Sequence, residues 1–510
     1  MDFNFPKPPT VPGSHLFFYI LGGTVFFLLC VAVWDVLQRK HTLRHNFPVA
    51  AWIRYILESQ REKIQQYFIE GPRTARPFNL RQREWIYRSS KNLPSALGFG
   101  TDLDLQAAGA WYFVHAGFPT LESESPTDAP LPPLIGAARK FPFQPRQYAN
   151  ISDMSFGSLG AAAVTALARG ASLSGAWLSS GEGGLSPYHL SAPCDRVFEV
   201  GTGLFGVREL DGTFSPQRYR ELSPQFRATT LKLSQGAKPG GGGVLPKAKI
   251  TAEIARIRNI PRDQDCHSPN RFKEFHDLPS MFAFIQLLQE TSGKPVGVKF
   301  CLGDRGFARE LVERIAVLPD GEGPDHIILD GAEGGTGAAP AGLADNMGTP
   351  IREALPWFDN LLREHGVRQR VRLIAAGRFA TASEVGYALA LGADTVNIAR
   401  GFMLSMGCIQ AMACHTNRCP TGITTHSAWL QAGLDPAEKG VRVANYALNL
   451  RRELMLLVRS MGLRSPSEIT RHHVFVNRGD GKSVSLSELW PYPKGADPRE
   501  LPAPLRARAG

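Results

Sequence analysis

The sequence predicts an α/β protein built on a (β/α)8 TIM barrel, with an N-terminal transmembrane helix and helical N- and C-terminal extensions. Short β-rich runs alternate with helical stretches between residues 149 and 398, which is typical of parallel sheets with right-handed crossovers. About eight such units in roughly 280 residues favour a closed barrel over an open sheet. No GxGxxG motif follows a first strand, so no nicotinamide site is expected.

The predicted strands are short, apolar and rich in β-branched residues. They include Ala176–Ser180, Thr229–Ser234, Val296–Phe300, His326–Asp330, Val371–Ala376 and Thr395–Ile398. Around them the chain divides into four parts. Residues 1–45 form a transmembrane anchor with a basic flank, residues 46–145 a helical region and linker, residues 146–430 the barrel with a cysteine-rich loop, and residues 431–510 a helical extension and tail.

Composition narrows the class of protein. The chain has 510 residues, enough for a large core, and its net charge is +11. Because no basic–aromatic module accompanies this charge, attraction to an anionic membrane face is expected rather than nucleic-acid binding. The seven cysteines are sparse and unevenly spaced, which argues against a secreted disulfide framework and fits a reducing compartment.

The segment from Leu16 to Trp34 is almost unbroken apolar sequence, long enough to cross a hydrocarbon layer of about 30 Å as a helix. A cleaved signal peptide is the alternative, but no small-residue cleavage pattern follows. Arg39, Lys40 and Arg44 come just after the span. The positive-inside rule therefore predicts a single-pass membrane protein with its N-terminus outside and its catalytic domain in the cytoplasm.

The regions that flank the barrel have simple patterns. Apolar residues at helical spacing between Trp52 and Ile64 predict an amphipathic helix, expected to pack on the main domain rather than on a membrane surface. Residues 121–145 are predicted to be a connector, residues 441–461 a further helix, and the tail from Pro491 an extended arm.

Cys408, Cys414 and Cys419 fall within a dozen residues. Thiolates at this spacing can hold one iron–sulfur cluster from a single loop, and three of them suit a three-iron 3Fe-4S cluster. Zinc is less suitable because no CxxC pair occurs in the chain, and the neighbouring His415 is expected to be structural. The alternative is three unrelated core thiols.

Three glycine-bearing loops follow predicted strands near the end of the barrel. They contain Gly334-Gly335-Thr336, Gly377-Arg378 and Ala399-Arg400-Gly401, and the last two follow the seventh and eighth strands, where barrels commonly bind a phosphate. Lys299 lies near the end of an apolar strand, where an anionic partner is expected to meet it. A surface lysine is the alternative.

These motifs occur together in the order found in a known family. Met154-Ser155-Phe156-Gly157, Gly181 to Gly184, Gln235 to Gly240, Lys299, Gly334 to Ala338 and the cysteine loop resemble the FMN-binding synthase domain of glutamate synthases over about residues 146–430. The resemblance implies FMN and a 3Fe-4S cluster. It implies that FMN contacts Met154, Ser155, Gln235, Lys299, Gly334, Gly335, Thr336, Gly377, Arg378, Ala399, Arg400 and Gly401, and that Cys408, Cys414 and Cys419 are the cluster ligands.

The resemblance also implies catalytic roles for four residues: Lys299, Gln235, Lys238 and Glu182. Gln235 and Lys238 match family residues that hold 2-oxoglutarate, and Glu182 either lies near the imino group or caps a turn. Gly241 and Val244 depart from the family, which usually has glutamate and glutamine there. His267 and Arg271 are expected to lie in a solvated loop.

The resemblance implies an oxidoreductase that reduces 2-iminoglutarate, formed from 2-oxoglutarate and ammonia, to L-glutamate. An external donor, a ferredoxin-like protein or a reductase subunit, would supply the electrons. One alternative is an N-alkylglutamate synthase that uses another amine, and a second is a membrane electron-transfer subunit. Full-length family members begin with an amidotransferase domain, which does not fit before Leu16, so free ammonia or a partner-supplied amine is expected, unless a separate glutaminase subunit docks.

Overall fold

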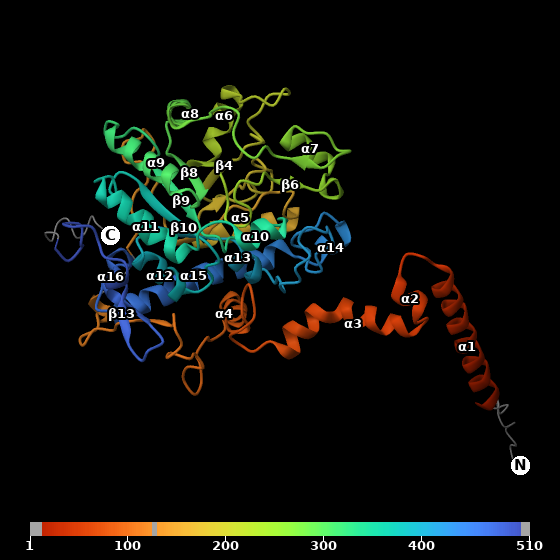
Figure 1. Cartoon of the computed structure of the whole chain (residues 1–510). Helices are drawn as coiled ribbons and strands as arrows, with labels where there is room; N and C mark the ends of the chain where they lie inside the picture. The colour runs from red at the N-terminus through yellow and green to blue at the C-terminus, as the bar shows by residue number, and fades with distance from the viewer. Residues whose placement is uncertain (1–12, 125–129, 501–510) are drawn as a thin grey trace, which may run out of the picture. The chain divides into compact units, whose positions relative to one another are not determined.

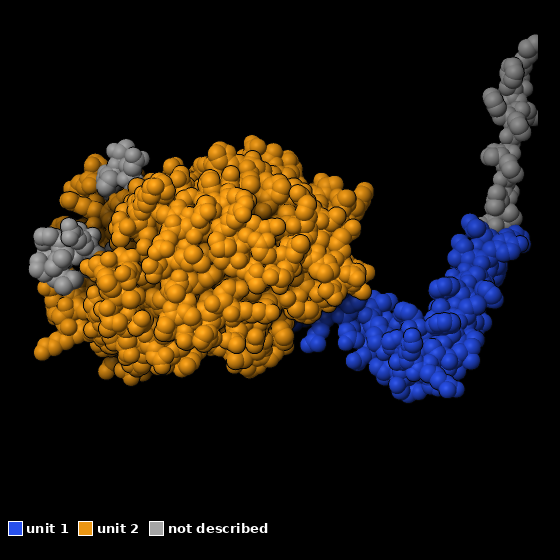
Figure 2. All heavy atoms as spheres, turned by 90° about the horizontal axis from the view of Figure 1, so that it is seen from above, with its two compact units in different colours: residues 1–76 blue, residues 77–510 orange. Residues whose placement is uncertain are grey.

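The structure is a computed structural model that describes residues 13–124 and 130–500. The chain divides into two compact units, residues 1–76 and 77–510 (Figure 2), which we describe separately. The predicted outward N-terminus and the last part of the predicted tail fall on residues 1–12 and 501–510, outside the described residues. Part of the predicted connector, residues 125–129, is also outside them.

The first unit is helical. Its elements are α1 (Gly13–Leu37), α2 (Thr42–Asn46), α3 (Ala50–Ile64) and a π-helical turn over Gln65–Ile69. Helix α1 contains the predicted span, and over His15–Leu37 its mean hydropathy is 2.5. Among the described residues it is the one helix long and apolar enough to cross a membrane. Helix α3 confirms the amphipathic helix predicted between Trp52 and Ile64.

A buried carboxylate closes the corner between α1 and α3. Oδ1 of Asp35 accepts a hydrogen bond from Nε of Arg44 at 2.8 Å, and its Oδ2 accepts from Nε1 of Trp52 at 2.9 Å and from the backbone N–H of Val49 at 3.1 Å. The Arg44 guanidinium lies 4.1 Å from the centre of the Trp52 ring. A fully buried carboxylate with these donors has its charge satisfied, so it fixes the chain where α1 ends.

The second unit is organised around a closed barrel of eight parallel strands (Figure 1). In sheet order the strands are β2 (Ala149–Ile151), β3 (Leu178–Ser179), β4 (Arg196–Val200), β5 (Ala228–Lys232), β8 (Val296–Cys301), β9 (His326–Asp330), β10 (Arg372–Ala376) and β11 (Thr395–Ile398). Strand β11 pairs with β2 and closes the ring. The predicted TIM barrel is therefore confirmed.

Helices follow most of the barrel strands. They are α5 (Ala161–Ser174), α6 (Pro216–Leu222), α7 (Ala252–Arg258), α8 (Leu278–Ser292), α9 (Arg305–Val317), α10 (Ala341–Asn346), α11 (Ile351–Glu364), α12 (Ala382–Ala390) and α13 (Arg400–Ser405). Several of them begin and end at residues that favour helix termini. Asp277 caps α8 through the backbone N–H of Ser280, and Gly293 ends it in the left-handed region. Thr381 and Glu384 form a capping box on α12.

The N-terminal and C-terminal segments of this unit pack on the barrel. They supply α4 (Leu80–Ser90), α14 (Ala428–Ala432), α15 (Pro436–Ser460), α16 (Leu486–Leu489) and a sheet of β1 (Trp111–Phe113), β12 (Val474–Asn477) and β13 (Ser483–Ser485). A short pair, β6 (Val244–Leu245) and β7 (Cys266–His267), lies in the insertion after β5. Ile135 and Phe143 of the predicted connector pair and join a buried cluster with Trp177.

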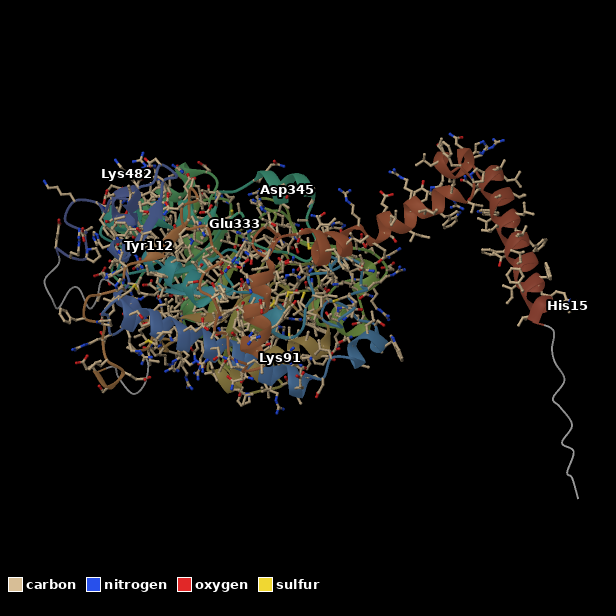
Figure 3. The ribbon with its side chains drawn as sticks, turned by 90° about the horizontal axis from the view of Figure 1, so that it is seen from below. His15, Lys91, Tyr112, Glu333, Asp345 and Lys482 are labelled. Atoms are coloured by element: carbon tan, nitrogen blue, oxygen red, sulfur yellow. The ribbon has the colours of Figure 1, made fainter. Side chains whose placement is uncertain are left out.

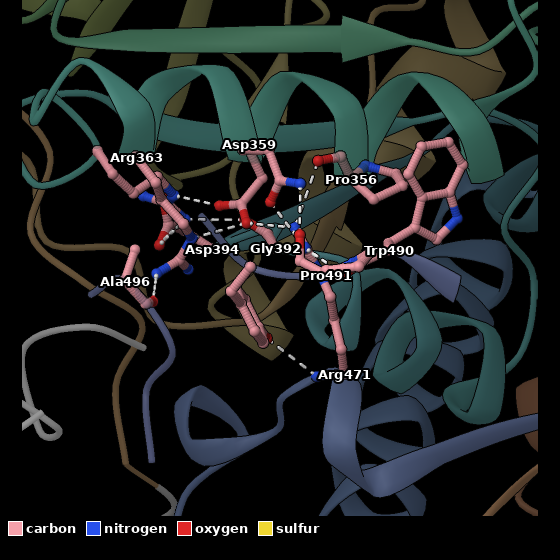
Figure 4. A network of polar contacts seen from close by, with 12 residues as sticks. Pro356, Asp359, Arg363, Gly392, Asp394, Arg471, Trp490, Pro491 and Ala496 are labelled. Atoms are coloured by element: carbon pink, nitrogen blue, oxygen red, sulfur yellow. Dashed lines mark hydrogen bonds and ion pairs between the residues drawn. The ribbon is translucent and has the colours of Figure 1, made fainter. Parts of the chain in front are cut away.

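An ionic network attaches the C-terminal extension to α11 (Figure 4). The carboxylate of Asp359 accepts hydrogen bonds from Arg363 and Arg368, both at 2.8 Å, and from Arg471 at 2.7 Å. Arg471 and Asp359 are fully buried. Burial raises the pKa of Asp359, but the three guanidinium groups outweigh it and hold the pKa below its usual value.

Candidate active site

A cavity of about 250 Å³ opens where the barrel strands end. Side chains come to it from loops after several strands, as in other barrels of this kind. Many of the residues predicted to bind a cofactor or substrate line this cavity. They are Met154, Ser155, Glu182, Gln235, Lys238, Gly335, Thr336, Ala399 and Arg400, together with Cys408 and Cys414. Nine of the predicted site residues and two of the predicted cluster ligands are thus brought to one cavity.

A second, smaller cavity of about 60 Å³ shares several of these residues. Its lining adds Lys299, Gly334, Gly377 and Arg378 to the predicted residues already named. Gly401 lines neither cavity, because it is buried where a Cβ would meet the Tyr446 hydroxyl at 2.4 Å. Gly401 therefore serves helix packing, whereas the other predicted cofactor residues face these two spaces.

The predicted anionic partner of Lys299 comes from the chain itself. Its ammonium forms an ion pair with Asp153, which follows β2, and lies 3.5 Å from Oε2 of Glu199 on β4. Ser179 donates a hydrogen bond to the same Asp153 carboxylate. The Lys299 side chain is 6% exposed and that of Glu199 is fully buried. Lys299 is therefore a buried cation inside the barrel, and the surface alternative is wrong.

A second lysine extends the network toward Glu182. Nζ of Lys232, at the end of β5, lies 3.2 Å from Oε2 of Glu182 and 3.7 Å from Oε1 of Glu199. The Glu182 carboxylate also lies against the glycine-rich loop of residues 235–243, where a Cβ on Gly243 would meet its Oε1 at 2.7 Å. Glycine at position 243 thus makes room for an ion pair at the edge of the larger cavity.

Burial and neighbouring charges give Asp153, Glu182 and Glu199 different pKa values. Burial raises the pKa of Asp153, but Lys299 outweighs it and the pKa lies well below its usual range. Lys232 likewise outweighs burial at Glu182 and holds its pKa low. Burial and the neighbouring Asp153 charge raise the pKa of Glu199 to about 8, with both lysines acting in the opposite direction. Glu199 is therefore the member of the network that carries a proton at neutral pH.

Both lysines remain charged. Burial disfavours the Lys299 ammonium, but Asp153 and Glu199 outweigh burial and raise its pKa. Burial of Lys232 is outweighed in the same way by Glu182 and Glu199. With Glu199 protonated, two cations face two anions, so the interior is electrically balanced.

The glycine loops bring backbone close to a partly buried guanidinium, that of Arg400. A Cβ on Gly335 would lie 2.6 Å from Nε of Arg400, so only glycine allows this approach. Arg400 donates to the carbonyl oxygen of Glu333, a residue labelled in Figure 3. Burial lowers the pKa of Arg400 to about 10, with Asp330 opposing it. Gly377 has φ +144, a conformation that glycine adopts readily.

Two cations, Lys238 and Arg258, line the larger cavity. Lys238 is 6% exposed, and within the part of the chain that the structure describes its ammonium has no hydrogen-bond or ion-pair partner. Arg258, at the end of α7, donates to Ser155 Oγ at 3.3 Å and to the Phe156 carbonyl at 3.2 Å. Its buried Nε has no hydrogen-bond partner among the described groups. The pair can therefore receive an anionic ligand.

The cysteine loop follows α13 and encloses a small cavity of its own. Cys408, Cys414 and Cys419 all line that cavity. Burial raises the pKa of Cys408 to about 12, whereas hydrogen bonds to Thr421 and Thr424 outweigh burial and lower that of Cys419. Over the described ranges, no three His, Cys, Asp or Glu side chains are arranged to hold a single metal ion. The three thiols nevertheless share one space.

Other predicted residues lie at the margin. His415 lines the larger cavity, and Val244 lines it while pairing in a short ladder with His267. His267 and Arg271 are exposed, and Arg271 lines a separate groove. Gly241 lies next to Leu343, which a Cβ would meet at 2.8 Å.

Sequence reasoning missed four charged members of the site: Asp153, Glu199, Lys232 and Arg258. Each had a signal. Asp153 directly precedes the Met154 motif, and Lys232 lies inside a predicted strand. Glu199 lies in β4, a strand that the sequence pattern did not predict. A charged residue inside a buried strand requires a partner, so these positions indicate an internal network.

Comparisons with known proteins identify the family to which the chain is similar. Residues 138–464 match the conserved region in glutamate synthase. The glutamate synthase large subunit-like protein YerD of Bacillus subtilis is 38% identical over 497 residues, which cover 89% of this chain and 93% of that protein. The archaeal glutamate synthase (NADPH) of Methanocaldococcus jannaschii is 35% identical over 341 residues, 66% of this chain and 62% of that protein, so this chain spans less than two thirds of that relative.

Solved structures resemble the chain only distantly. The recombinant flavin-binding domain of baker's yeast flavocytochrome b2 has a TM-score of 0.43 and 12% identity, with 79% of this chain and 81% of that chain covered.

Proposed function

We propose, since this chain belongs to the family of the conserved region in glutamate synthase, that it reduces 2-iminoglutarate to L-glutamate. As a member of this family the chain is an oxidoreductase. The observation that carries the specific proposal is the meeting of Lys238, Arg258, Glu182 and the cysteine loop around one cavity. Electrons would come from an external donor, and the nitrogen from free ammonia or a partner-supplied amine.

The residues around the smaller cavity suit FMN. Arg400 is a partly buried guanidinium without a carboxylate ion-pair partner in the described chain, and it faces glycine backbone that leaves space for a phosphate. Lys299 would meet the pyrimidine side of the flavin ring. When bound, the flavin supplies hydride chemistry, and the chain supplies position and charge. Gln235 and Gly335 line both cavities.

The thiols suit an iron–sulfur cluster. Three sulfur donors around one cavity match the ligand number of a three-iron cluster. Two of the three, Cys408 and Cys414, also line the larger cavity, so a cluster held there would lie beside the substrate and flavin space. This placement supports single-electron transfer from the donor through the cysteine loop.

The larger cavity suits a dicarboxylate that carries an imine. Lys238 and Arg258 offer an ammonium and a guanidinium to the two carboxylates. Glu182 remains ionised beside Lys232, where it can accept hydrogen bonds from the imino nitrogen. Glu199, which is protonated at neutral pH, lies nearby and holds a proton that can be donated. The chain therefore orients the substrate, balances its charge and holds a proton close by.

A second amine remains a candidate because Val244 gives the cavity an apolar wall near Glu182. Val244 lines the cavity and is half exposed. A methyl or ethyl group on the nitrogen could pack there, as in an N-alkylglutamate synthase. A membrane electron-transfer subunit is a third candidate, since a cluster and flavin could act without a substrate.

Product analysis tests this proposal. Purified protein, chemically reduced without oxygen, would receive 2-oxoglutarate with isotopically labelled ammonium or with methylamine. Labelled L-glutamate from ammonium supports the main proposal. N-methylglutamate formed in preference to glutamate would favour the second candidate, and no amino-acid product with either amine would favour electron transfer. Visible and EPR spectra of the same samples would record the flavin and the cluster.

The first unit supports attachment to a membrane. Helix α1 has the length and hydropathy of a single span, and Arg39, Lys40 and Arg44 follow it. We therefore propose that α1 anchors the enzyme with the barrel in the cytoplasm. There the donor, a ferredoxin-like protein or a reductase subunit, would reach the cysteine loop.

A further inference from the structure

Lys249 is a buried cation whose charge has no carboxylate partner in the described chain. It ends the 3-10 turn Lys247–Lys249 and is 3% exposed. Its ammonium donates to the carbonyl oxygen of Ser158 at 2.9 Å, and among the described residues it forms no ion pair. Burying an ammonium with a single neutral acceptor is costly. The position of Lys249 therefore indicates that an anionic group belongs beside it.

The cysteine loop lies on that side. Lys249 lines the larger cavity together with Cys414, and the Cys414 and Cys419 sulfurs lie within electrostatic range of its ammonium. The side-chain amide of Asn417, inside the cysteine loop, donates to the carbonyl oxygen of Ala248 at 3.0 Å. This hydrogen bond attaches the turn that carries Lys249 to the loop that carries the thiols.

The Lys249 turn also contacts the loop after β2, which lines the larger cavity. Ser158, which accepts from Lys249, lines the larger cavity and follows Met154 and Ser155 in the loop after β2. Lys249 thus lies between that loop and the cysteine loop. A charge at this position acts on both, and more strongly than a solvated lysine because little water screens it.

We propose that the Lys249 ammonium balances the negative charge of the iron–sulfur cluster and raises its reduction potential. The inference rests on the cluster of the proposed function. Each electron accepted from the external donor, which is oxidised by one electron, adds one negative charge next to Lys249, and no bond forms or breaks. A nearby cation stabilises that added charge, so electrons enter the loop more readily.

The same turn provides a matched control. Lys247 is two residues away, carries the same charge and is exposed, so solvent screens it. The variants to compare are Lys249→Met, Lys249→Gln, Lys249→Arg and Lys247→Met. Glutamine at 249 can keep the hydrogen bond to Ser158 without the charge, and arginine can keep the charge. An EPR-monitored redox titration of the purified full-length protein, with iron and sulfide analysis, is the measurement.

The expected result is a lower cluster potential in Lys249→Met and Lys249→Gln at unchanged iron content, with Lys249→Arg and Lys247→Met close to the parent. If the neutral variants lose iron while Lys249→Arg keeps it, the charge is needed to hold the cluster and the inference also stands. A parent-like potential in both neutral variants overturns it, and so does equal loss of iron in Lys249→Gln and Lys249→Arg. Iron-free parent protein would instead overturn the proposed cluster.

Discussion

Nζ of Lys299 lies 3.5 Å from Oε2 of Glu199 and also forms an ion pair with Asp153. Lys232 joins the same Glu199 carboxylate to Glu182. Three acids and two lysines therefore form one network that lines the two cavities. Because the charges balance only when one acid is neutral, the network connects protonation of Glu199 to the stability of the barrel.

Glu199→Gln is expected to change how stability depends on pH. The pKa of Glu199 rises from 4.5 to about 8 on folding, through burial and Asp153. Between these values the folded chain holds a proton that the unfolded chain lacks, so this group lowers stability as pH rises, by up to about 1.4 kcal/mol per pH unit. Glutamine removes this loss.

Thermal unfolding of the parent and Glu199→Gln between about pH 6 and pH 8 measures the effect. The variant should gain stability relative to the parent as pH increases. His189 and His326 have pKa values lowered to about 4, with burial as the main cause. They act equally in both proteins, so the comparison isolates Glu199. A stability difference that does not vary with pH would show that Glu199 is already ionised.

Lys299→Met is expected to lower both stability and turnover. It leaves Asp153 and Glu199 buried without their shared cation, which costs about 3–5 kcal/mol. If Lys299 lies beside the flavin, as proposed, loss of its positive charge should also lower the flavin potential and reduce turnover by about 100-fold or more. The double variant Lys299→Met/Asp153→Asn should recover part of the stability but not the activity. Unchanged potential and unchanged turnover would place Lys299 away from the flavin.

Replacing Cys408, Cys414 or Cys419 by serine is expected to remove the cluster while flavin is retained. A three-ligand loop that loses one thiolate leaves an iron atom open to solvent. Iron, sulfide and flavin analysis of each purified variant tests this expectation. Cys266→Ser is a matched control because Cys266 is also a buried cavity-lining thiol. Full iron content in Cys414→Ser would show that the ligand assignment is wrong.

Removal of residues 1–37 is expected to release a soluble protein that keeps its flavin. The deletion takes away α1 and leaves the barrel, which lies entirely in the second unit. Carbonate extraction of membranes should leave the full chain in the pellet and the shortened chain in the supernatant. Protease added outside intact cells should not reach the barrel. Cleavage of the barrel by that protease would mean that the orientation is reversed.

Much of the barrel could be predicted, because the local pattern of apolar residues determines where most strands lie. Six predicted strands coincide with β3, β5, β8, β9, β10 and β11 to within a few residues, since buried parallel strands are read as apolar runs. Strand β2 is three residues long, and β4 carries Arg196 and Glu199. Neither has a continuous apolar run, so pattern alone did not identify them.

Site residues that belong to a sequence motif could be predicted. Ion pairs between residues far apart in the sequence could not. Glycine loops and cysteine spacing can be recognised in the sequence, and most of the residues they identified line the two cavities. The partners of Lys299 are separated from it by 146 residues for Asp153 and 100 residues for Glu199. Such pairs arise from barrel closure, and so they required the folded structure.

The central claim is that the protein, once its flavin is reduced, reduces an imine formed from 2-oxoglutarate and ammonia. The most direct test follows the flavin absorbance of anaerobically reduced protein after rapid mixing. We predict that the oxidised flavin spectrum returns when 2-oxoglutarate and ammonium are added together but not with either alone, with one L-glutamate formed per two electrons. Flavin that stays reduced with both present, or that is oxidised without formation of glutamate, would contradict the account.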